Sequence, residues 1–165
     1  MGALAIARRE IVIRPAQWQE LVDLRHVILR QGLPREAAVF EGDDLPSSRH
    51  CGAFCEGVAV GCATLLASRW EHEPAWQLRG MATAPEFRSM GLGRAMLEQL
   101  EGRLVADAVA GGAVPLLLWC NARVPAVKFY QKQGWTVVSK EFEIPTAGPH
   151  VKMMKRLTER RHGEA

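Results

Sequence analysis

The sequence predicts a single α/β domain, and three observations indicate it. The chain has 165 residues, a length that one hydrophobic core can organise. Strand-like runs alternate with helical patterns along most of it. One of these strands leads through a glycine turn into a long amphipathic helix, a connection typical of α/β proteins. We expect the domain to span residues 10–156, with short flexible termini at 1–9 and 157–165.

The first half of the chain predicts two helices and three strands. Alternating apolar residues indicate strands, and apolar residues at three-to-four-residue spacing indicate helices. The expected elements are a strand at 10–14, a helix at 18–29 that ends before Gly32, a second short helix at 34–40, an acidic turn at 41–46, and strands at 50–55 and 58–67 that Glu56-Gly57 joins as a hairpin.

The second half predicts the remaining elements by the same rules. They are a charged loop at 69–74, a strand at 75–83, a helix at 92–109 stopped by Gly111-Gly112, a strand at 115–120 buried on both faces, a helix at 125–133 stopped by Gly134, and a last pair of strands at 135–144 and 150–156.

The central feature is the glycine turn between the strand at 75–83 and the helix at 92–109. Its sequence is Arg88-Ser89-Met90-Gly91-Leu92-Gly93-Arg94. The first turn of a helix has unpaired N–H groups and the positive end of the helix dipole, and glycine lets a phosphate approach the backbone. Two arginines add positive charge. The turn therefore predicts a phosphate-binding site.

The turn lacks the last glycine of a dinucleotide-binding fingerprint, because that position is Met96, and it lacks the Gly-Lys-Ser/Thr ending of a Walker loop. It matches Arg/Gln-x-x-Gly-x-Gly/Ala, and on this motif the chain resembles the GCN5-related N-acetyltransferase (GNAT) superfamily from about residue 10 to 156. The resemblance implies an α/β (α+β) single-domain acyl-CoA N-acyltransferase fold. This fold has a mixed, mostly antiparallel central sheet, splayed between the fourth and fifth strands, with helices on both faces.

The same resemblance implies a binding site for acetyl-CoA, the acyl donor. The glycine turn from Arg88 to Arg94 (Arg88, Ser89, Met90, Gly91, Leu92, Gly93 and Arg94) would bind the pyrophosphate. The backbone of Met81, Ala82 and Thr83 would pair with the pantetheine arm like an added strand. Core packing is the other interpretation of Met81 and Ala82, and it is compatible with the first, since the binding role belongs to the backbone.

A second motif lies downstream and looks like the family's Asn-x-x-Ala-x-x-x-Tyr-x-x-x-Gly-Phe. Here Asn121 stands five residues before Ala126 instead of three, and Trp135 replaces the phenylalanine. The resemblance implies that Asn121 hydrogen-bonds the coenzyme arm; an ordinary helix N-cap is the equal alternative. It also implies that Tyr130, the only tyrosine, protonates the departing thiolate, whereas a partly buried helix residue is the plainer interpretation.

The implied reaction is direct transfer of the acetyl group to a primary amine, of a small molecule or of a peptide or protein. A backbone N–H of the fourth strand would stabilise the charge that gathers on the carbonyl oxygen. A covalent intermediate on Cys120 is the disfavoured alternative. The sequence leaves the general base open among seven residues, each of which also suits a solvated surface position: Glu71, His72, Glu73, Asp43, Asp44, His26 and His150.

Composition narrows the class of partner. The net charge is only +3 and the basic residues are spread along the chain, so no nucleic-acid partner is expected. The chain contains no run of 18 apolar residues, so we expect no membrane-spanning helix. The four cysteines lack metal-binding spacing, which predicts reduced thiols in a cytoplasmic protein and no metal. The acceptor, the acyl chain preference and the oligomeric state, a homodimer included, stay open.

Two functional classes therefore remain. The first is an acetyl-CoA-dependent N-acetyltransferase. The alternative is a non-catalytic acyl-CoA-binding or regulatory module on the same fold, which would keep the glycine turn without needing Tyr130. The presence of Tyr130 at the family's position favours the enzyme.

Overall fold

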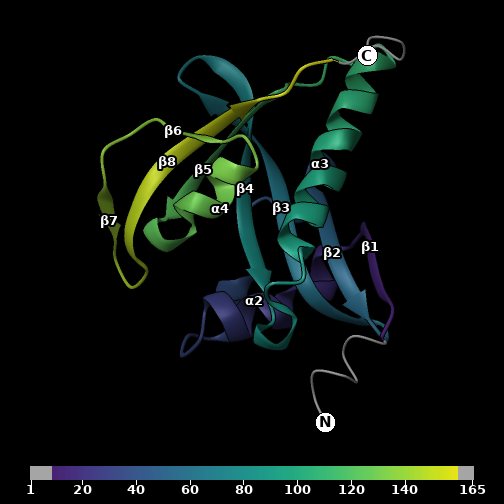
Figure 1. Ribbon diagram of the computed structural model, residues 1–165, viewed down its shortest axis with the longest axis vertical. Coiled ribbons are helices and arrows are strands. Elements are labelled where there is room, and N and C mark those ends of the chain that lie inside the picture. Colours follow the sequence, from purple (N-terminus) through teal and green to yellow (C-terminus); the bar gives the residue numbers. More distant parts are fainter. Residues whose placement is uncertain (1–8, 160–165) are drawn as a thin grey trace. The chain divides into compact units, whose positions relative to one another are not determined.

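The computed structural model describes residues 9–159 (Figure 1). Of the two expected flexible termini, 1–8 and 160–165 lie outside the described residues. The elements follow in this order: β1 (Ile11–Pro15), the 3-10 helix η1 (Trp18–Glu20), α2 (Val22–Leu29), η2 (Arg35–Ala38), β2 (Arg49–Cys55), β3 (Val58–Trp70), β4 (Glu73–Thr83), η3 (Pro85–Phe87), α3 (Leu92–Val109), β5 (Leu117–Arg123), η4 (Val124–Ala126), α4 (Val127–Lys132), β6 (Thr136–Val137), β7 (Phe142–Ile144) and β8 (Gly148–Arg156).

The strands form one mixed, mostly antiparallel sheet, which confirms the predicted fold class. Their order is β1-β2-β3-β4-β5-β8-β6, and β7 pairs with β8. The parallel pair, β4 with β5, is in register at Trp76↔Leu118 and Gln77↔Trp119. Both strands continue beyond these residues, to Thr83 and Arg123. The short pairing agrees with the splay expected between the fourth and fifth strands.

The chain divides into two compact units, and β3, β4 and α3 each contribute to both. Within the described residues, the first unit comprises 9–66 and Gly80–Leu100, and the second comprises Ala67–Arg79 and 101–159. The glycine turn and the end of β4 belong to the first unit. Asn121 and Tyr130 belong to the second.

In the first unit, helices cover both faces of β2 and β3. A side chain at Gly52 would collide with Phe54 and Leu21, so the chain around η1 and α2 packs on that face. Gly61 faces the other way, toward Met96 of α3: a Cβ on Gly61 would stand only 3.0 Å from the methyl carbon and 3.2 Å from the sulfur of that methionine. Since successive side chains of a strand point to opposite faces of the sheet, α2 packs on one face of β2 and β3 and α3 packs on the other.

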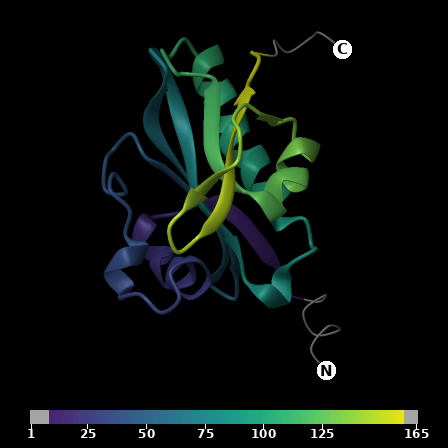
Figure 2. The same ribbon diagram turned by 90° about the vertical axis from the view of Figure 1, so that its left-hand side faces the viewer.

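In the second unit, β5 pairs along its whole length with β8, from Leu117↔Arg156 to Arg123↔His150. The yellow β8 lies beside β5 in Figure 2. Lys155 of β8 donates a hydrogen bond to the carbonyl of Gln133 at the end of α4 (2.6 Å) and forms an ion pair with Glu101 of α3 (2.9 Å). The helices of this unit therefore lie on the face of β8 that carries Lys155.

Most predicted elements are confirmed, and the hairpin at Glu56-Gly57 has a positive φ at both residues, as a tight turn between twisted strands requires. The charged loop expected at 69–74 was wrong at its ends. β3 continues to Trp70 and β4 begins at Glu73, so Glu71 and His72 alone make the turn. The charged residues of this segment are mostly exposed, as expected, but exposed residues can still belong to strands when a neighbouring strand pairs with their backbone.

Two other segments differ in detail. The short helix expected at 34–40 is the 3-10 helix η2, and the strand expected at 135–144 is interrupted between β6 and β7. Ser139, in the interruption, accepts a hydrogen bond from the backbone N–H of Lys152 at 2.8 Å. A side chain there replaces one bond that a continuous strand would have made with β8.

Candidate active site

The glycine turn exposes the start of α3. Arg88, Ser89, Met90 and Gly91 are exposed, and α3 begins at Leu92. Ser89 and Gly91 both have left-handed backbone, with φ of 63° and 78°. No acidic residue stands in the first turn of the helix to neutralise its positive end. The start of α3 therefore combines exposed left-handed backbone with a first turn free of acidic side chains, and both features favour an anion.

The two arginines of the turn differ in their partners. Nε of Arg88 donates to the backbone carbonyl of Thr83, the last residue of β4, at 3.3 Å. Within residues 9–159 no carboxylate forms an ion pair with it. Arg94 instead pairs with Glu98 one helical turn later, at 2.8 Å. The guanidinium of Arg88 thus keeps N–H donors for an anion, while the charge of Arg94 is largely balanced.

The end of β4 leads into this turn. Gly80 adopts left-handed backbone inside the strand, with φ of 64°. Ala82 packs its side chain against Leu21, Phe54 and Cys62, as the core-packing interpretation expected. Met81 and Thr83 are half-buried. The side chain of Ala82 is thus part of the core, whereas the expected contact with the coenzyme involves only the backbone of this segment.

Asn121 lies within β5, so the N-cap alternative was wrong. The residue at the N-cap of η4 is Arg123, and it makes no side-chain capping bond. Asn121 stands opposite Lys152 of β8, whose Nζ donates to its Oδ1 at 3.2 Å. The pairing with β8 extends the strand past the apolar run at 115–120, and this is what takes Asn121 out of the helix.

Lys152 was not among the sequence candidates. Its Nζ lies 4.6 Å from the ring centroid of Trp119 and 5.6 Å from that of Phe142. These are cation–π distances. In the described part of the chain no carboxylate pairs with Lys152. A lysine in the last strand gives no local signal, because the pairing of β5 with β8 alone brings it beside Asn121.

Tyr130 is a buried residue of α4, packed edge-on against Phe129 and tilted against Trp135, with ring centroids 5.2 and 5.5 Å away. Burial raises the pKa of its phenol, and the neighbouring Cys120 raises it further. The hydroxyl therefore stays protonated throughout the physiological pH range. Burial also raises the pKa of Cys120 to about 12, so its thiol is neutral and a poor nucleophile.

Two of the candidate carboxylate bases are already engaged. Asp43 is buried and accepts hydrogen bonds from the guanidinium of Arg25, at 2.6 and 3.1 Å. Glu73 forms an exposed bidentate pair with Arg156, at 2.7 and 2.9 Å, and the hydrogen bonds lower its pKa. Both carboxylates are therefore already paired with a guanidinium in the structure. Asp44 and Glu71 are exposed turn residues.

The candidate histidines are held by backbone carbonyls. Nε2 of His26 lies 2.7 Å from the carbonyl oxygen of Leu33, and Nδ1 of His150 lies 2.7 Å from that of Gly148. Since a carbonyl only accepts, each nitrogen must carry the proton, which leaves the other ring nitrogen as the basic one. His26 is half-buried, His150 is buried and His72 is exposed in the β3–β4 turn. The histidines thus remain open as bases.

The family model described as "Acetyltransferase (GNAT) family" matches residues 17–135, a range that contains both the glycine turn and Tyr130. The chain belongs to the GNAT family. It is an acetyltransferase, and the resemblance found in the sequence is confirmed. The chain is 30% identical over 142 residues to the uncharacterized N-acetyltransferase YitI of Bacillus subtilis (strain 168), which covers 84% of this chain and 91% of that protein.

Solved structures of this GNAT fold agree. Escherichia coli ElaA matches with a TM-score of 0.69 and 16% identity, over 89% of this chain and 100% of that one. An aminoglycoside 6'-N-acetyltransferase complexed with coenzyme A matches with a TM-score of 0.68 and 15% identity, over 91% and 99% of the two chains. At these identities the likeness concerns the fold alone.

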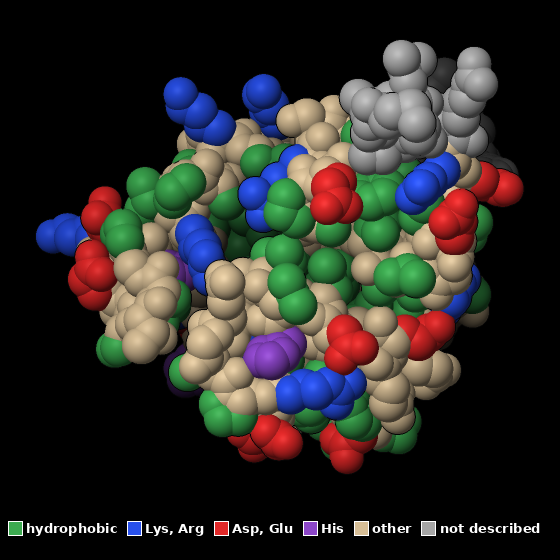
Figure 3. All heavy atoms as spheres, turned by 90° about the horizontal axis from the view of Figure 1, so that it is seen from below, with side chains coloured by type: hydrophobic (Ala, Val, Ile, Leu, Met, Phe, Trp, Pro, Cys, Tyr) green, Lys and Arg blue, Asp and Glu red, His purple; other side chains and the backbone are tan. Residues whose placement is uncertain are grey.

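The face shown in Figure 3 carries Lys and Arg as well as Asp and Glu side chains, with hydrophobic side chains between them. In the described range, no helix is both long and apolar enough to span a membrane. Within the same range, no group of three or more His, Cys, Asp or Glu side chains is arranged to hold a metal ion.

Proposed function

We propose that this chain transfers an acetyl group from acetyl-CoA to a primary amine by direct attack. The glycine turn binds the coenzyme phosphates, and Tyr130 protonates the departing thiolate. The observation that carries the proposal is the turn itself. An exposed left-handed Gly91 precedes the helix α3, and beside it stands Arg88, with no carboxylate partner in residues 9–159. Unpaired N–H groups, a helix dipole and an uncompensated guanidinium together favour a phosphate.

Two further findings support acetyl-CoA as the donor. The chain is a member of an acetyltransferase family, and a protein of the same fold was solved with coenzyme A bound. The end of β4 also suits the pantetheine arm, because the parallel pairing with β5 is in register only at Trp76 and Gln77. The backbone of Met81, Ala82 and Thr83 lies beyond that pairing, and in this proposal it is the segment along which the arm binds.

The chemistry needs one base and one acid. The lone pair of a neutral amine attacks the thioester carbonyl carbon, and the oxygen gathers negative charge that a backbone N–H of β4 stabilises. When the carbon–sulfur bond breaks, its electrons stay on sulfur. The amine nitrogen loses its proton to the base, and the sulfur takes one from Tyr130, which then regains a proton from solvent.

The raised pKa values of Tyr130 and Cys120 bear on the roles of proton donor and nucleophile. Burial keeps Tyr130 protonated, which is the state a donor needs, but it also makes the phenol a weaker acid than in water. The transfer therefore depends on negative charge developing on the sulfur. Cys120 is neutral at physiological pH, and this supports direct transfer over a covalent intermediate. None of the four cysteines, all of which lie in the described residues, forms a disulfide.

The acceptor belongs to the class of primary amines, and the non-catalytic module is the alternative to exclude. A panel of amines with acetyl-CoA, followed by release of free thiol, distinguishes the two. An enzyme releases thiol faster when its amine is present. A binding module binds acetyl-CoA and shows no amine-dependent release.

The deciding variant is Tyr130→Phe, which keeps the ring and deletes the proton donor. Its affinity for acetyl-CoA should stay within a few fold, while kcat falls by about a hundredfold, the usual scale for a positioned acid. Phe129→Leu is the control, because it disturbs the packing of the Tyr130 ring and leaves the hydroxyl. Full wild-type turnover in Tyr130→Phe would remove the tyrosine from the mechanism.

A further inference from the structure

Arg25 is a fully buried charge in the first unit. It lies on α2, in line with Leu21 and Ile28 on the apolar side of the helix, and its exposed fraction is 0%. Four of its five N–H donors are used. They bind both carboxylate oxygens of Asp43 (2.6 and 3.1 Å), the carbonyl of Ala38 (3.2 Å) and the hydroxyl of Thr64 (2.8 Å).

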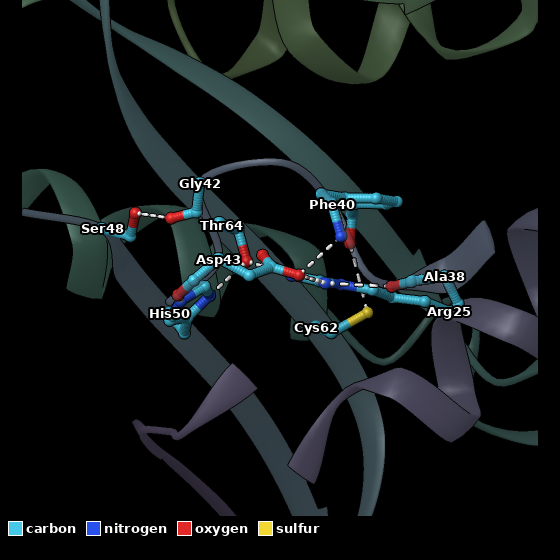
Figure 4. A network of polar contacts seen from close by, with 10 residues as sticks. Arg25, Ala38, Phe40, Gly42, Asp43, Ser48, His50, Cys62 and Thr64 are labelled. Carbon is cyan, nitrogen blue, oxygen red and sulfur yellow. Dashed lines mark hydrogen bonds and ion pairs between the residues drawn. The ribbon is translucent and has the colours of Figure 1, made fainter. Parts of the chain in front are cut away.

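The partners of Arg25 are themselves fixed. The backbone N–H of Phe40 donates to Asp43 at 2.7 Å. Thr64 accepts from Arg25, so its own hydrogen is free to donate to Nδ1 of His50, 2.8 Å away, and Nε2 of His50 then donates to the carbonyl of Asp43 at 2.9 Å. Figure 4 shows Asp43 with Arg25 on one side and His50 on the other. The hydrogen bonds close a ring, which gives the guanidinium one orientation.

Stability alone does not explain such a group. Burying two charges costs nearly as much free energy as their attraction returns, and well-packed apolar residues are often as stabilising. What a guanidinium offers instead is a rigid plane in a defined orientation.

The plane is held against Gly80. A Cβ on Gly80 would stand 3.2 Å from Nε of Arg25 and 2.6 Å from the ring of Phe40. The guanidinium carbon lies 4.2 Å from the centroid of that ring, so the two groups form one surface beside the glycine. Nε is the one donor of Arg25 without a partner in the described residues, and it is the nitrogen nearest to Gly80.

Gly80 is also held through its carbonyl. The thiol of Cys62, on β3, donates to this oxygen at 3.2 Å. Burial raises the pKa of Cys62 to about 12, so the thiol keeps the hydrogen that it donates. With φ of 64°, Gly80 turns the chain inside β4, directly before Met81, Ala82 and Thr83. A change of its backbone to the extended form would rotate the peptide groups that follow.

We propose that Arg25 is a positioning residue for the coenzyme-binding segment of β4. Asp43 and Thr64 orient its guanidinium, which together with Phe40 keeps Gly80 in its left-handed conformation. Gly80 in turn aims the N–H and C=O groups of Met81–Thr83. The proposal rests on the proposed function, in which these groups bind the pantetheine arm. Arg25 itself touches no substrate.

The first test removes the charge pair without leaving a lone charge in the core. Arg25→Met combined with Asp43→Leu replaces both charged residues by apolar ones, and such replacements of a buried ion pair are often tolerated. Calorimetric titration with acetyl-CoA is carried out on the wild type and on the double variant, and melting curves verify that both are folded. We expect a folded double variant whose Kd for acetyl-CoA rises tenfold or more. Affinity does not depend on global stability while the protein is folded, so a merely structural pair would leave Kd unchanged.

A matched pair of glycine variants gives the second test, and it decides if the double variant does not fold. Gly80→Ala places a methyl group against Phe40 and Arg25. Gly57→Ala places one at a similar left-handed residue, φ 78°, with nothing within 4 Å. We expect Gly80→Ala to bind acetyl-CoA at least tenfold more weakly and Gly57→Ala to bind it within twofold of wild type.

The outcomes separate the two proposals. If the wild type does not bind acetyl-CoA, the proposed function fails. If the wild type binds it and the folded double variant binds equally well, the positioning role of Arg25 fails while the function stands. If the double variant is unfolded, a Gly80→Ala variant that binds as tightly as Gly57→Ala overturns the role.

Discussion

Replacing Gly91 by valine should separate phosphate binding from the folding of the turn. Gly91 is exposed, has φ of 78°, and an added Cβ would meet nothing within 4 Å. A side chain there collides with no neighbour, so its cost to folding is backbone strain alone. Left-handed backbone costs an L residue about 1–2 kcal/mol. For a domain of this size we expect the Tm to fall by about 2–8 °C.

Gly57 offers a control that carries the same strain. It stands in the β2–β3 hairpin with the same φ of 78° and nothing within 4 Å of an added Cβ. Gly57→Val should therefore lower the Tm by a similar amount. Only Gly91→Val should weaken coenzyme binding, because its side chain occupies the space that a phosphate needs. One charge-assisted hydrogen bond contributes about 1.5–3 kcal/mol, which corresponds to roughly ten- to a hundredfold in Kd.

The assay is calorimetric titration with acetyl-CoA, repeated with S-acetylpantetheine, which lacks the pyrophosphate. Gly91→Val should bind acetyl-CoA more than tenfold more weakly than Gly57→Val. The two variants should bind S-acetylpantetheine equally. Equal affinities of the two folded variants for acetyl-CoA would refute the assignment of the phosphates to this turn.

Two other predictions follow from the same structure. Arg88→Ala should raise the KM for acetyl-CoA about ten- to a hundredfold with little change in Tm, because the one hydrogen bond of Arg88, to the carbonyl of Thr83, is exposed. The control is Arg103→Ala, which changes an exposed arginine later on α3. An unfolded Arg88→Ala variant would show that Arg88 has a structural role instead. Burial lowers the pKa of His50 in the folded protein, outweighing the nearby Asp43, so the unfolded chain takes up the proton first as the pH falls. Stability should be fully present above about pH 6.5 and decrease below it, and a His50→Gln variant with the same loss of Tm between pH 7.5 and 5.5 would contradict this origin.

The glycine turn could be predicted because its chemistry is local. Left-handed residues, a helix start and flanking arginines all lie within a few positions, and the helix from Leu92 to Val109 has the bounds that its apolar spacing indicated. The hairpin at Glu56-Gly57 is a second example. In each case neighbouring residues alone decide the backbone.

The status of Asn121 could not be predicted for the opposite reason. A polar residue after an apolar run suggests a cap when only the local sequence is considered. β5 instead continues through it because the strand pairs with β8, in which Lys152 stands opposite. That partner lies 31 positions later in the chain. Strand ends depend on such distant partners more than helix ends do.

Arg25 and Arg88 show how burial divides one residue type between two roles. Each is a cation near the same end of β4, and by composition each would suit a phosphate. Arg25 has its carboxylate, 18 positions later in Asp43, and its four hydrogen bonds leave only Nε without a partner in the described residues, 3.2 Å from where a Cβ on Gly80 would stand. Arg88 has one long bond to a carbonyl and faces solvent. The first can act on the coenzyme only through the backbone it holds, whereas the second can donate to a phosphate directly. Loss of Arg88 should therefore be felt only by ligands that carry the pyrophosphate, whereas loss of the Arg25–Asp43 pair should weaken S-acetylpantetheine as well.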